Sequence, residues 1–231
     1  VAETLEDVIA CWSVAYQVFL RYHLIEPNPF GWHTAPEAID AESVFVLGRQ
    51  REQAVSTAAG IIGGPGGLPL DAVYHDELAL MRREGRRLIE IGLVAGVGGA
   101  GAGILGTLRM AALFGVSCGC TDFVCGMHPR RAALYGRLFG MRPAGRERRY
   151  PASRERPDLS MRGNFAESRR TARACRFSQE NSLPQAALAG RFRFNANLPA
   201  HAKVEQFLHY VRAQAHEPRR GAADQRDAAM G

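Results

Sequence analysis

Residues 93–110, LVAGVGGAGAGILGTLRM, decide the fold of this chain. They contain GVGGAG at positions 96–101, a literal G-x-G-x-x-G between an apolar run and a helix-like segment. Glycines in such a turn let backbone N–H groups approach a phosphate at the N-terminus of the following helix. The letters alone leave two hypotheses open: a dinucleotide-binding turn, or a different phosphate-binding turn with the same spacing.

The apolar pattern on either side of the turn predicts alternating helices and strands. The predicted elements are a helix over residues 3–22, a hairpin of strands 43–48 and 53–62, a helix over 74–84, a buried strand over 87–95, a helix over 104–114 with Gly115 at its C-cap, a strand over 120–127, and a helix over 129–139 followed by Gly140. A dinucleotide fold expects an acidic residue about 20 positions after its glycine turn, and Asp122 satisfies that spacing. A hairpin and about 90 residues precede the turn, however, and this weighs against a dinucleotide fold.

The strand, turn and helix over residues 87–114 are similar to the GNAT acyltransferase fold. The next strand and helix, CGMHPRRAALYGRLFGM at 125–141, also resemble that fold, chiefly through Tyr135, Gly140 and Met141. In GNAT proteins the glycine turn holds the diphosphate of an acyl thioester carrier, as any helix N-terminus binds an anion. The resemblance implies that the donor phosphate binds the backbone of Val97, Gly98, Gly99, Ala100, Gly101 and Gly103.

The first half of the chain narrows the resemblance. GLPLD at 67–71, an acidic segment at 76–82, GRR at 85–87 and Glu90 occur in the order found in FeeM-type N-acyl amino acid synthases, relatives of the LuxI-type autoinducer synthases. With these motifs the resemblance spans about residues 8–150. It implies an α+β, GNAT-like fold with a mixed central sheet flanked by helices. It also implies an N-acyltransferase that moves a long acyl group from acyl carrier protein to an amino acid or a related small amine.

Glu90 is the candidate base, or a carboxylate that orients the amine. It lies in an apolar strand, where burial should raise the pKa of its carboxyl group into a useful range. Leu88, Gly92 and Val94 are expected on the same face of the strand, and Gly92 would leave open space beside the carboxylate. The alternative is a structural ion pair of a buried Glu90 with Arg86 or Arg87.

Tyr135 is the second candidate catalytic residue. The resemblance implies that it protonates the departing thiolate, whereas an ordinary core anchor on an amphipathic helix is the alternative. The oxyanion would be stabilised by a backbone N–H near residues 93–95, and no metal is expected.

Arginine dominates the basic residues of a chain whose net charge is +6. Between residues 130 and 176, fourteen arginines face four acids, and such a patch favours an anionic partner unless it is an ordinary solvated surface. Little aromatic interleaving disfavours nucleic acid, and acyl carrier protein is the expected partner. The candidates for binding substrate or carrier are Arg86, Arg87, Gly92, Leu93, Arg130 and Arg131.

The predicted organisation is an acyltransferase domain over residues 1–150, an extension over 151–215, and a disordered tail over 216–231. The extension contains a candidate strand at 189–195 and an amphipathic helix at 200–215, which can complete the sheet and add a helix. No apolar run reaches the roughly 18 residues of a membrane span, and the five cysteines lack C-x-x-C spacing. We therefore expect a cytoplasmic protein with no permanently bound cofactor, for which acyl-phosphopantetheine or acyl-CoA is the donor substrate.

Two other functions remain open on the same fold. One is an N-acetyltransferase that uses acetyl-CoA or another short acyl-CoA. The other is an inactive protein that binds acyl groups or a carrier protein. The inactive alternative is suggested by the second hairpin strand, where an arginine usual in the family is replaced by TAAG at 57–60.

Overall fold

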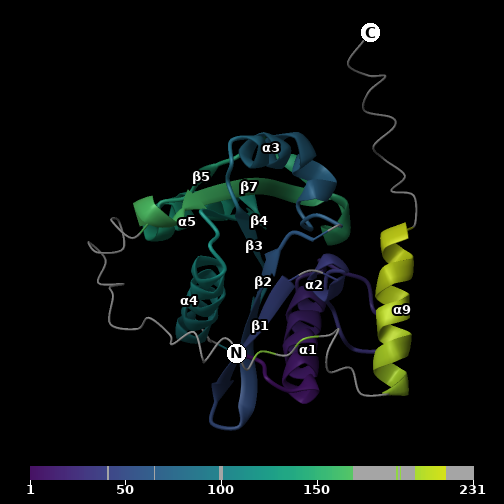
Figure 1. Ribbon diagram of the computed structural model, residues 1–231. Helices are drawn as coiled ribbons and strands as arrows, with labels where there is room; N and C mark the ends of the chain where they lie inside the picture. The colour runs from purple at the N-terminus through teal and green to yellow at the C-terminus, as the bar shows by residue number, and fades with distance from the viewer. Residues whose placement is uncertain are drawn as a thin grey trace.

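A mixed β-sheet runs through the middle of the protein and carries helices on both faces (Figure 1). The computed structural model describes residues 1–40, 42–64, 66–98, 101–168, 191, 193 and 201–216. The helices in these ranges are α1 (Leu5–Arg21), α2 (Glu37–Asp40), α3 (Asp71–Arg83), α4 (Gly101–Ser117), α5 (Ala132–Phe139) and α9 (Ala202–His216). The strands are β1 (Glu42–Gln50), β2 (Gln53–Ile62), β3 (Leu88–Gly96), β4 (Asp122–Met127), β5 (Arg142–Pro143), β6 (Arg148–Tyr150) and β7 (Arg156–Asn164). The predicted α+β architecture is confirmed.

The strand pairing leaves the sheet open at its centre. The order is β1-β2-β3-β4-β7-β5, and β6 also pairs with β7. β3 and β4 run parallel, but their pairing covers only residues 88–90 against 122–124. Beyond these residues β3 continues along β2 while β4 continues along β7. The two central strands therefore part just after Glu90.

Several predicted elements are confirmed with small shifts at their ends. α1 begins at a capping box, in which the Thr4 hydroxyl and the Asp7 carboxylate accept each other's backbone N–H groups. β1 and β2 form the predicted hairpin, and α9 matches the predicted C-terminal helix. Gly140 ends α5 in the left-handed region, with a φ of 65°.

The helix after the glycine turn differs from the prediction at both ends. α4 begins at Gly101, within the turn, and continues to Ser117, so Gly115 lies inside the helix and not at its C-cap. A Cβ at Gly115 would come within 2.7 Å of Ile89 Cγ2. The glycine therefore serves close packing of α4 on β3, a role that sequence position alone does not reveal.

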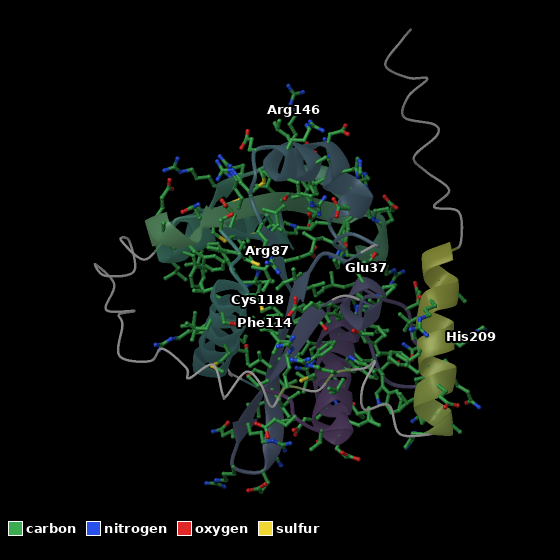
Figure 2. The ribbon with its side chains drawn as sticks, viewed as in Figure 1. Glu37, Arg87, Phe114, Cys118, Arg146 and His209 are labelled. Carbon is green, nitrogen blue, oxygen red and sulfur yellow. The ribbon has the colours of Figure 1, made fainter. Side chains whose placement is uncertain are left out.

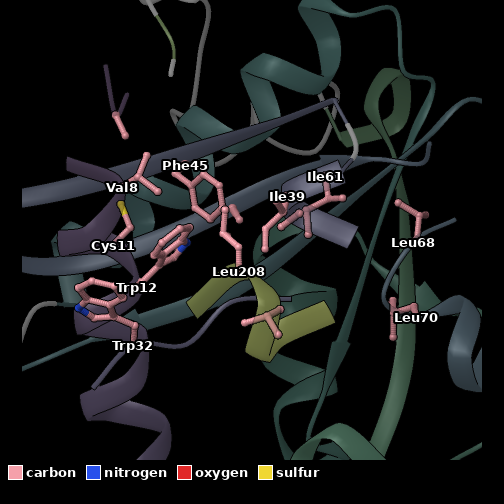
Figure 3. Close-up of a cluster of buried hydrophobic side chains, with 14 of the residues drawn as sticks. Val8, Cys11, Trp12, Trp32, Ile39, Phe45, Ile61, Leu68, Leu70 and Leu208 are labelled. Atoms are coloured by element: carbon pink, nitrogen blue, oxygen red, sulfur yellow. The ribbon is translucent and has the colours of Figure 1, made fainter. Parts of the chain in front are cut away.

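Each face of the sheet has its own hydrophobic core. The first core contains side chains of α1, α3 and α9, among them Trp12, whose ring centroid lies 5.0 Å from that of Phe207. Figure 3 shows Trp12 between Trp32 and Phe45, with Leu208 of α9 on the same cluster. The second core contains side chains of α4 and α5. α9 thus belongs to the first core although it lies far along the chain.

β7 completes the sheet in a segment where no strand was predicted. It pairs with β4, β5 and β6, so the sheet extends beyond residue 150. Its buried residues are Asp158, Ser160, Met161 and Gly163, of which only one is a large apolar side chain. Most of the strand predicted at 189–195, and the tail from residue 217, lie outside the described residues.

Candidate active site

Glu90 lies at the point where β3 and β4 part. It is the last residue of β3 that pairs with β4, and only 5% of it is exposed. Its Oε2 accepts a 2.9 Å hydrogen bond from the amide of Leu70. Burial raises the pKa of Glu90 to about 8, although this hydrogen bond acts in the opposite direction. A carboxyl group with such a pKa exchanges its proton close to neutral pH.

The GLPLD turn at residues 67–71 positions the backbone amide of Leu70 so that it donates a hydrogen bond to Glu90. The Asp71 carboxylate accepts a 2.7 Å hydrogen bond from the amide of Leu68. Both of its oxygens also bind the guanidinium group of Arg82, each at 2.7 Å. Asp71 thus closes the loop and ties it to α3, which fixes the direction of the Leu70 N–H group.

Arg86 and Arg87 each interact with another acid, and neither forms an ion pair with Glu90. Arg86 donates a 3.0 Å hydrogen bond to Asp122, and Arg87 lies 4.0 Å from Glu42. The alternative of a structural ion pair between Glu90 and either arginine is therefore wrong.

Acidic side chains face Glu90 instead. After burial, the negative charges of Glu37, Asp71 and Asp158 raise the pKa of Glu90 further. Figure 2 shows Glu37 at α2, on the side of the sheet that α1 and α9 cover. Arg82 forms an ion pair with Asp71. Glu37 and Asp158 form no ion pair with another described residue, so their place near Glu90 calls for an explanation.

A β-bulge follows Glu90 on β3. The register against β2 slips between Gly92 and Ala95, so Leu93 and Val94 together oppose a single residue of β2. Leu93 has a φ of 51°, a region that non-glycine residues rarely adopt. Leu93 packs with the α1 face and Val94 with the α4 face. The prediction that Val94 shares a face with Glu90 is therefore wrong, because the extra residue shifts the alternation.

A cavity of about 2650 Å³ opens where β3 and β4 part. Side chains from both cores line it, including Phe207 of α9 and Leu108 of α4, so it reaches both faces of the sheet. It is larger than a typical pocket for one small ligand, which measures roughly 300–1,000 Å³. The predicted site residues that line the cavity are Glu90, Gly92, Leu93, Arg130, Arg131 and Tyr135.

The other predicted site residues that the structure describes are not among those that line the cavity. Arg86 and Arg87 precede β3, at the end of the strand away from the bulge. Gly96 and Ile104 line the cavity at either end of the glycine turn. Between them lie Val97, Gly98, Gly101 and Gly103, whereas Gly99 and Ala100 are outside the described residues. Phosphate binding by this turn stays a prediction.

Tyr135 lies on α5 and lines the α4 side of the cavity. Its ring packs on Phe139 with a centroid distance of 5.5 Å, as an anchor of the core would. Burial raises the pKa of Tyr135, so the hydroxyl keeps its proton at neutral pH and is able to donate it. The packing role and the proposed acid role are compatible.

Sequence reasoning missed two features of the cavity wall. Asp158 of β7 is buried and lines the cavity, and Gly126 of β4 lies against its carboxylate. An aspartate among arginines resembles a solvated surface acid, so the sequence carried no signal for it.

The family model described as N-acyl amino acid synthase FeeM matches residues 10–164. That match covers well over half of the chain and includes the turn, Glu90 and Tyr135. The chain belongs to the FeeM family. As a FeeM-family protein with this fold, it is an N-acyltransferase.

Solved structures share the fold of this FeeM-family chain. The structure of FeeM, an N-acyl amino acid synthase from uncultured soil microbes, aligns with a TM-score of 0.62 and 18% identity over 73% of this chain and 96% of that one. BjaI, a CoA-dependent acyl-homoserine lactone synthase with SAM and isopentyl-CoA, aligns with a TM-score of 0.57 and 14% identity over 87% and 90% of the two chains. The acyl-homoserine lactone synthase LasI aligns with a TM-score of 0.51 and 14% identity over 70% and 84%.

A search of the curated proteins found no match to the FeeM-family chain. Among its described residues, none of the helices combines the length and apolar character needed to cross a membrane.

Proposed function

We propose that the protein transfers a long-chain acyl group from acyl carrier protein to the amine of an amino acid or a related small amine. The observation that carries the proposal is Glu90, a buried carboxyl group with a raised pKa beside Gly92 at the opening of the sheet. Gly92 adds no side chain there, because a Cβ would meet only Glu90 Oε1, at 3.7 Å. The family supports transfer to an amine.

The chemistry follows from the positions of these groups. Glu90 in its ionised form accepts a proton from the ammonium group of the acceptor, and the free amine then attacks the thioester carbonyl carbon. The C–N bond forms, and the nitrogen loses its second proton to Glu90, which has by then released the first proton to solvent. The C–S bond breaks to give an amide and a thiolate. The amides of the bulge at Leu93 and Val94 would stabilise the oxyanion, and Tyr135 would protonate the thiolate.

Arginines on the cavity wall suit an anionic donor. Arg109 of α4 and Arg130 and Arg131 before α5 line the cavity, and none of the three forms an ion pair with another described residue. We assign them to the phosphate of the phosphopantetheine arm or to the acidic surface of the carrier protein. The backbone of Gly98 and Gly101 would bind the phosphate beside them.

CoA is the second candidate donor, because the BjaI structure that shares this fold is described as CoA-dependent. The two donors carry the same pantetheine arm and differ in what is attached to it. An assay with one acyl chain presented on each donor therefore decides between them.

The test is direct synthesis with the purified chain. One long acyl group is supplied on acyl carrier protein or on CoA, with a panel of amino acids and simple amines, and amides are measured by mass spectrometry. We expect an amide, formed more efficiently from the carrier protein. Faster synthesis from CoA would refute the donor assignment, and no amide from either donor with any amine would refute the function.

Glu90→Gln should lower kcat/KM on the order of 100-fold or more, because the general base is removed. Glu52→Gln, on the exposed hairpin turn, is the matched control and should retain full activity. Equal activity of the two variants would remove Glu90 from the mechanism.

A further inference from the structure

Asp158 is a buried acid that forms no ion pair with another described residue. It is 7% exposed and lines the same cavity as Glu90. Its Oδ1 has no hydrogen-bond partner among the described residues. The Tyr74 hydroxyl donates a 2.8 Å hydrogen bond to the backbone oxygen of Asp158, and its interaction with the carboxylate lowers the pKa of Asp158 against the larger effect of burial. Buried polar groups in proteins are nearly always paired, so an unpaired carboxylate oxygen in a residue that lines a cavity points to a ligand contact.

Gly126 links Asp158 to the Glu90 side of the cavity. A Cβ at Gly126 would lie 2.8 and 3.0 Å from the two carboxylate oxygens of Asp158 and 2.9 Å from Leu70 Cδ2. Leu70 is also the residue whose amide binds Glu90. Leu70 therefore contacts the surroundings of both carboxyl groups, and the negative charge of Asp158 acts on Glu90. The missing side chain at Gly126 makes room for the Asp158 carboxylate itself.

The arginine nearest to Asp158 along the sheet is already occupied. Arg148 of β6 is the register partner of Asp158 on β7. Its guanidinium group binds Glu77 at 2.6 and 3.0 Å and also donates to the backbone oxygen of Val73. Glu37 lines the cavity too, and so do Arg149, Arg154 and Arg156, of which Arg154 is paired with Glu26. No ion pair of a described residue neutralises Glu37 or Asp158.

We infer that Asp158 is a second acceptor-binding residue, and that the acceptor enters as an ammonium ion held between Asp158 and Glu90. This inference rests on the proposed function, because it assigns the acceptor end of the same cavity. The arginines of the proposed donor end, Arg109, Arg130 and Arg131, suit the opposite charge.

The arrangement also divides the work of the two carboxylates. Glu90 takes the proton that the ammonium group must lose before it attacks the thioester. Asp158 holds the ammonium ion through Oδ1 and keeps it beside Glu90 until that proton has been transferred and the neutral amine attacks. Removing the charge of Asp158 should weaken acceptor binding while leaving the acyl donor bound as before.

Binding of a simple probe tests the inference without catalysis. n-Butylammonium and n-butanol have nearly the same shape and differ in charge, so each is titrated into the full chain by calorimetry. We expect the wild type to bind the ammonium ion and not the alcohol, and Asp158→Asn to raise the Kd for n-butylammonium about tenfold, equivalent to about 1.4 kcal/mol. Asp158→Ser, a smaller side chain, should have the same effect.

Ser160→Ala is the matched control. Ser160 lies two residues further along β7, is buried, and has a hydroxyl with no partner among the described side chains, but it does not line the cavity. Its Kd for n-butylammonium should equal that of the wild type. Equal Kd values for the wild type and both Asp158 variants would overturn the inference.

Steady-state kinetics separate this inference from the proposed function. With an active wild type, Asp158→Asn should raise the acceptor KM about tenfold and leave the donor KM unchanged. Amide synthesis with an unchanged acceptor KM would sustain the function and refute the role of Asp158. Absence of synthesis together with charge-dependent binding of n-butylammonium would refute the function and sustain the cation site.

Discussion

Replacing Glu90 by glutamine should change how the stability of the fold depends on pH. Burial raises the pKa of Glu90 from 4.5 to about 8 in the folded protein. Between these two values the unfolded chain has lost a proton that the folded protein still holds, so the free energy of unfolding falls as pH rises. Above about pH 8 the carboxyl group ionises in the folded protein too, and the free energy of unfolding stops falling.

The size of the effect follows from the pKa shift. Each unit corresponds to about 1.4 kcal/mol, so Glu90 should lower the free energy of unfolding by about 3 kcal/mol at pH 7 and by about 5 kcal/mol at pH 9, relative to pH 4. Glutamine has nearly the same shape and can still accept the Leu70 hydrogen bond through its amide oxygen, but it does not titrate. The variant should therefore be more stable than the wild type at pH 9 and similar to it near pH 4.

Urea unfolding at pH 5, 7 and 9 measures this difference. The fluorescence of Trp12 and Trp32 reports the transition, because both indole rings lie in the core on the α1 face. Asp158 contributes a pH dependence of the same sign, since burial raises its pKa to about 7, so the comparison between variants isolates Glu90. Glu52→Gln should follow the wild-type curve. A stability difference between wild type and Glu90→Gln that does not grow with pH would refute the assignment of a raised pKa.

Three further substitutions test the site and the fold. Tyr135→Phe should lower kcat by about 100-fold at unchanged melting temperature, and an unchanged kcat would leave Tyr135 a packing role alone. Asp71→Ala frees the loop that holds Glu90, so urea unfolding should show a loss of about 1–3 kcal/mol together with lower kcat/KM, whereas wild-type behaviour would make the turn dispensable. Gly115→Ala places a Cβ 2.7 Å from Ile89 Cγ2, and the free energy of unfolding should fall by about 1–3 kcal/mol. A more stable variant would show that helix propensity outweighs packing there.

Much of the acyltransferase fold could be predicted because its elements bury regular apolar patterns. The hairpin, the central strand and the N-terminal helix repeat apolar residues with the period of their secondary structure, and the glycine turn marks the strand-to-helix connection. Glu90 stands out in the sequence because an acid within a buried strand is costly unless it has a function or a partner, and the FeeM resemblance favours a function, which stays a prediction. The structure then excluded the ion pair with Arg86 or Arg87 that the sequence had left as an alternative.

The parts that were missed depend on contacts that local pattern does not encode. β7 buries Asp158, Ser160 and Gly163 against β4, so it lacks the apolar alternation that marks a strand. The bulge at Leu93 is one extra residue within an apolar run, and any position in that run would look the same. Gly115 resembles a helix end, and only the approach of Ile89 shows why it lies inside α4.

The two buried carboxyl groups make physical sense together only when a cation lies between them. Each alone destabilises the folded protein as pH rises, because burial has raised the pKa of both Glu90 and Asp158. A bound ammonium ion favours the ionised forms and so lowers both pKa values, which returns part of that lost stability. By the same linkage, the acceptor should bind more tightly as pH rises toward 8, until the amine itself loses its charge. A pair of carboxyl groups that lowers stability until a substrate cation binds therefore favours a cationic substrate, and Gly92 leaves space beside Glu90 for it.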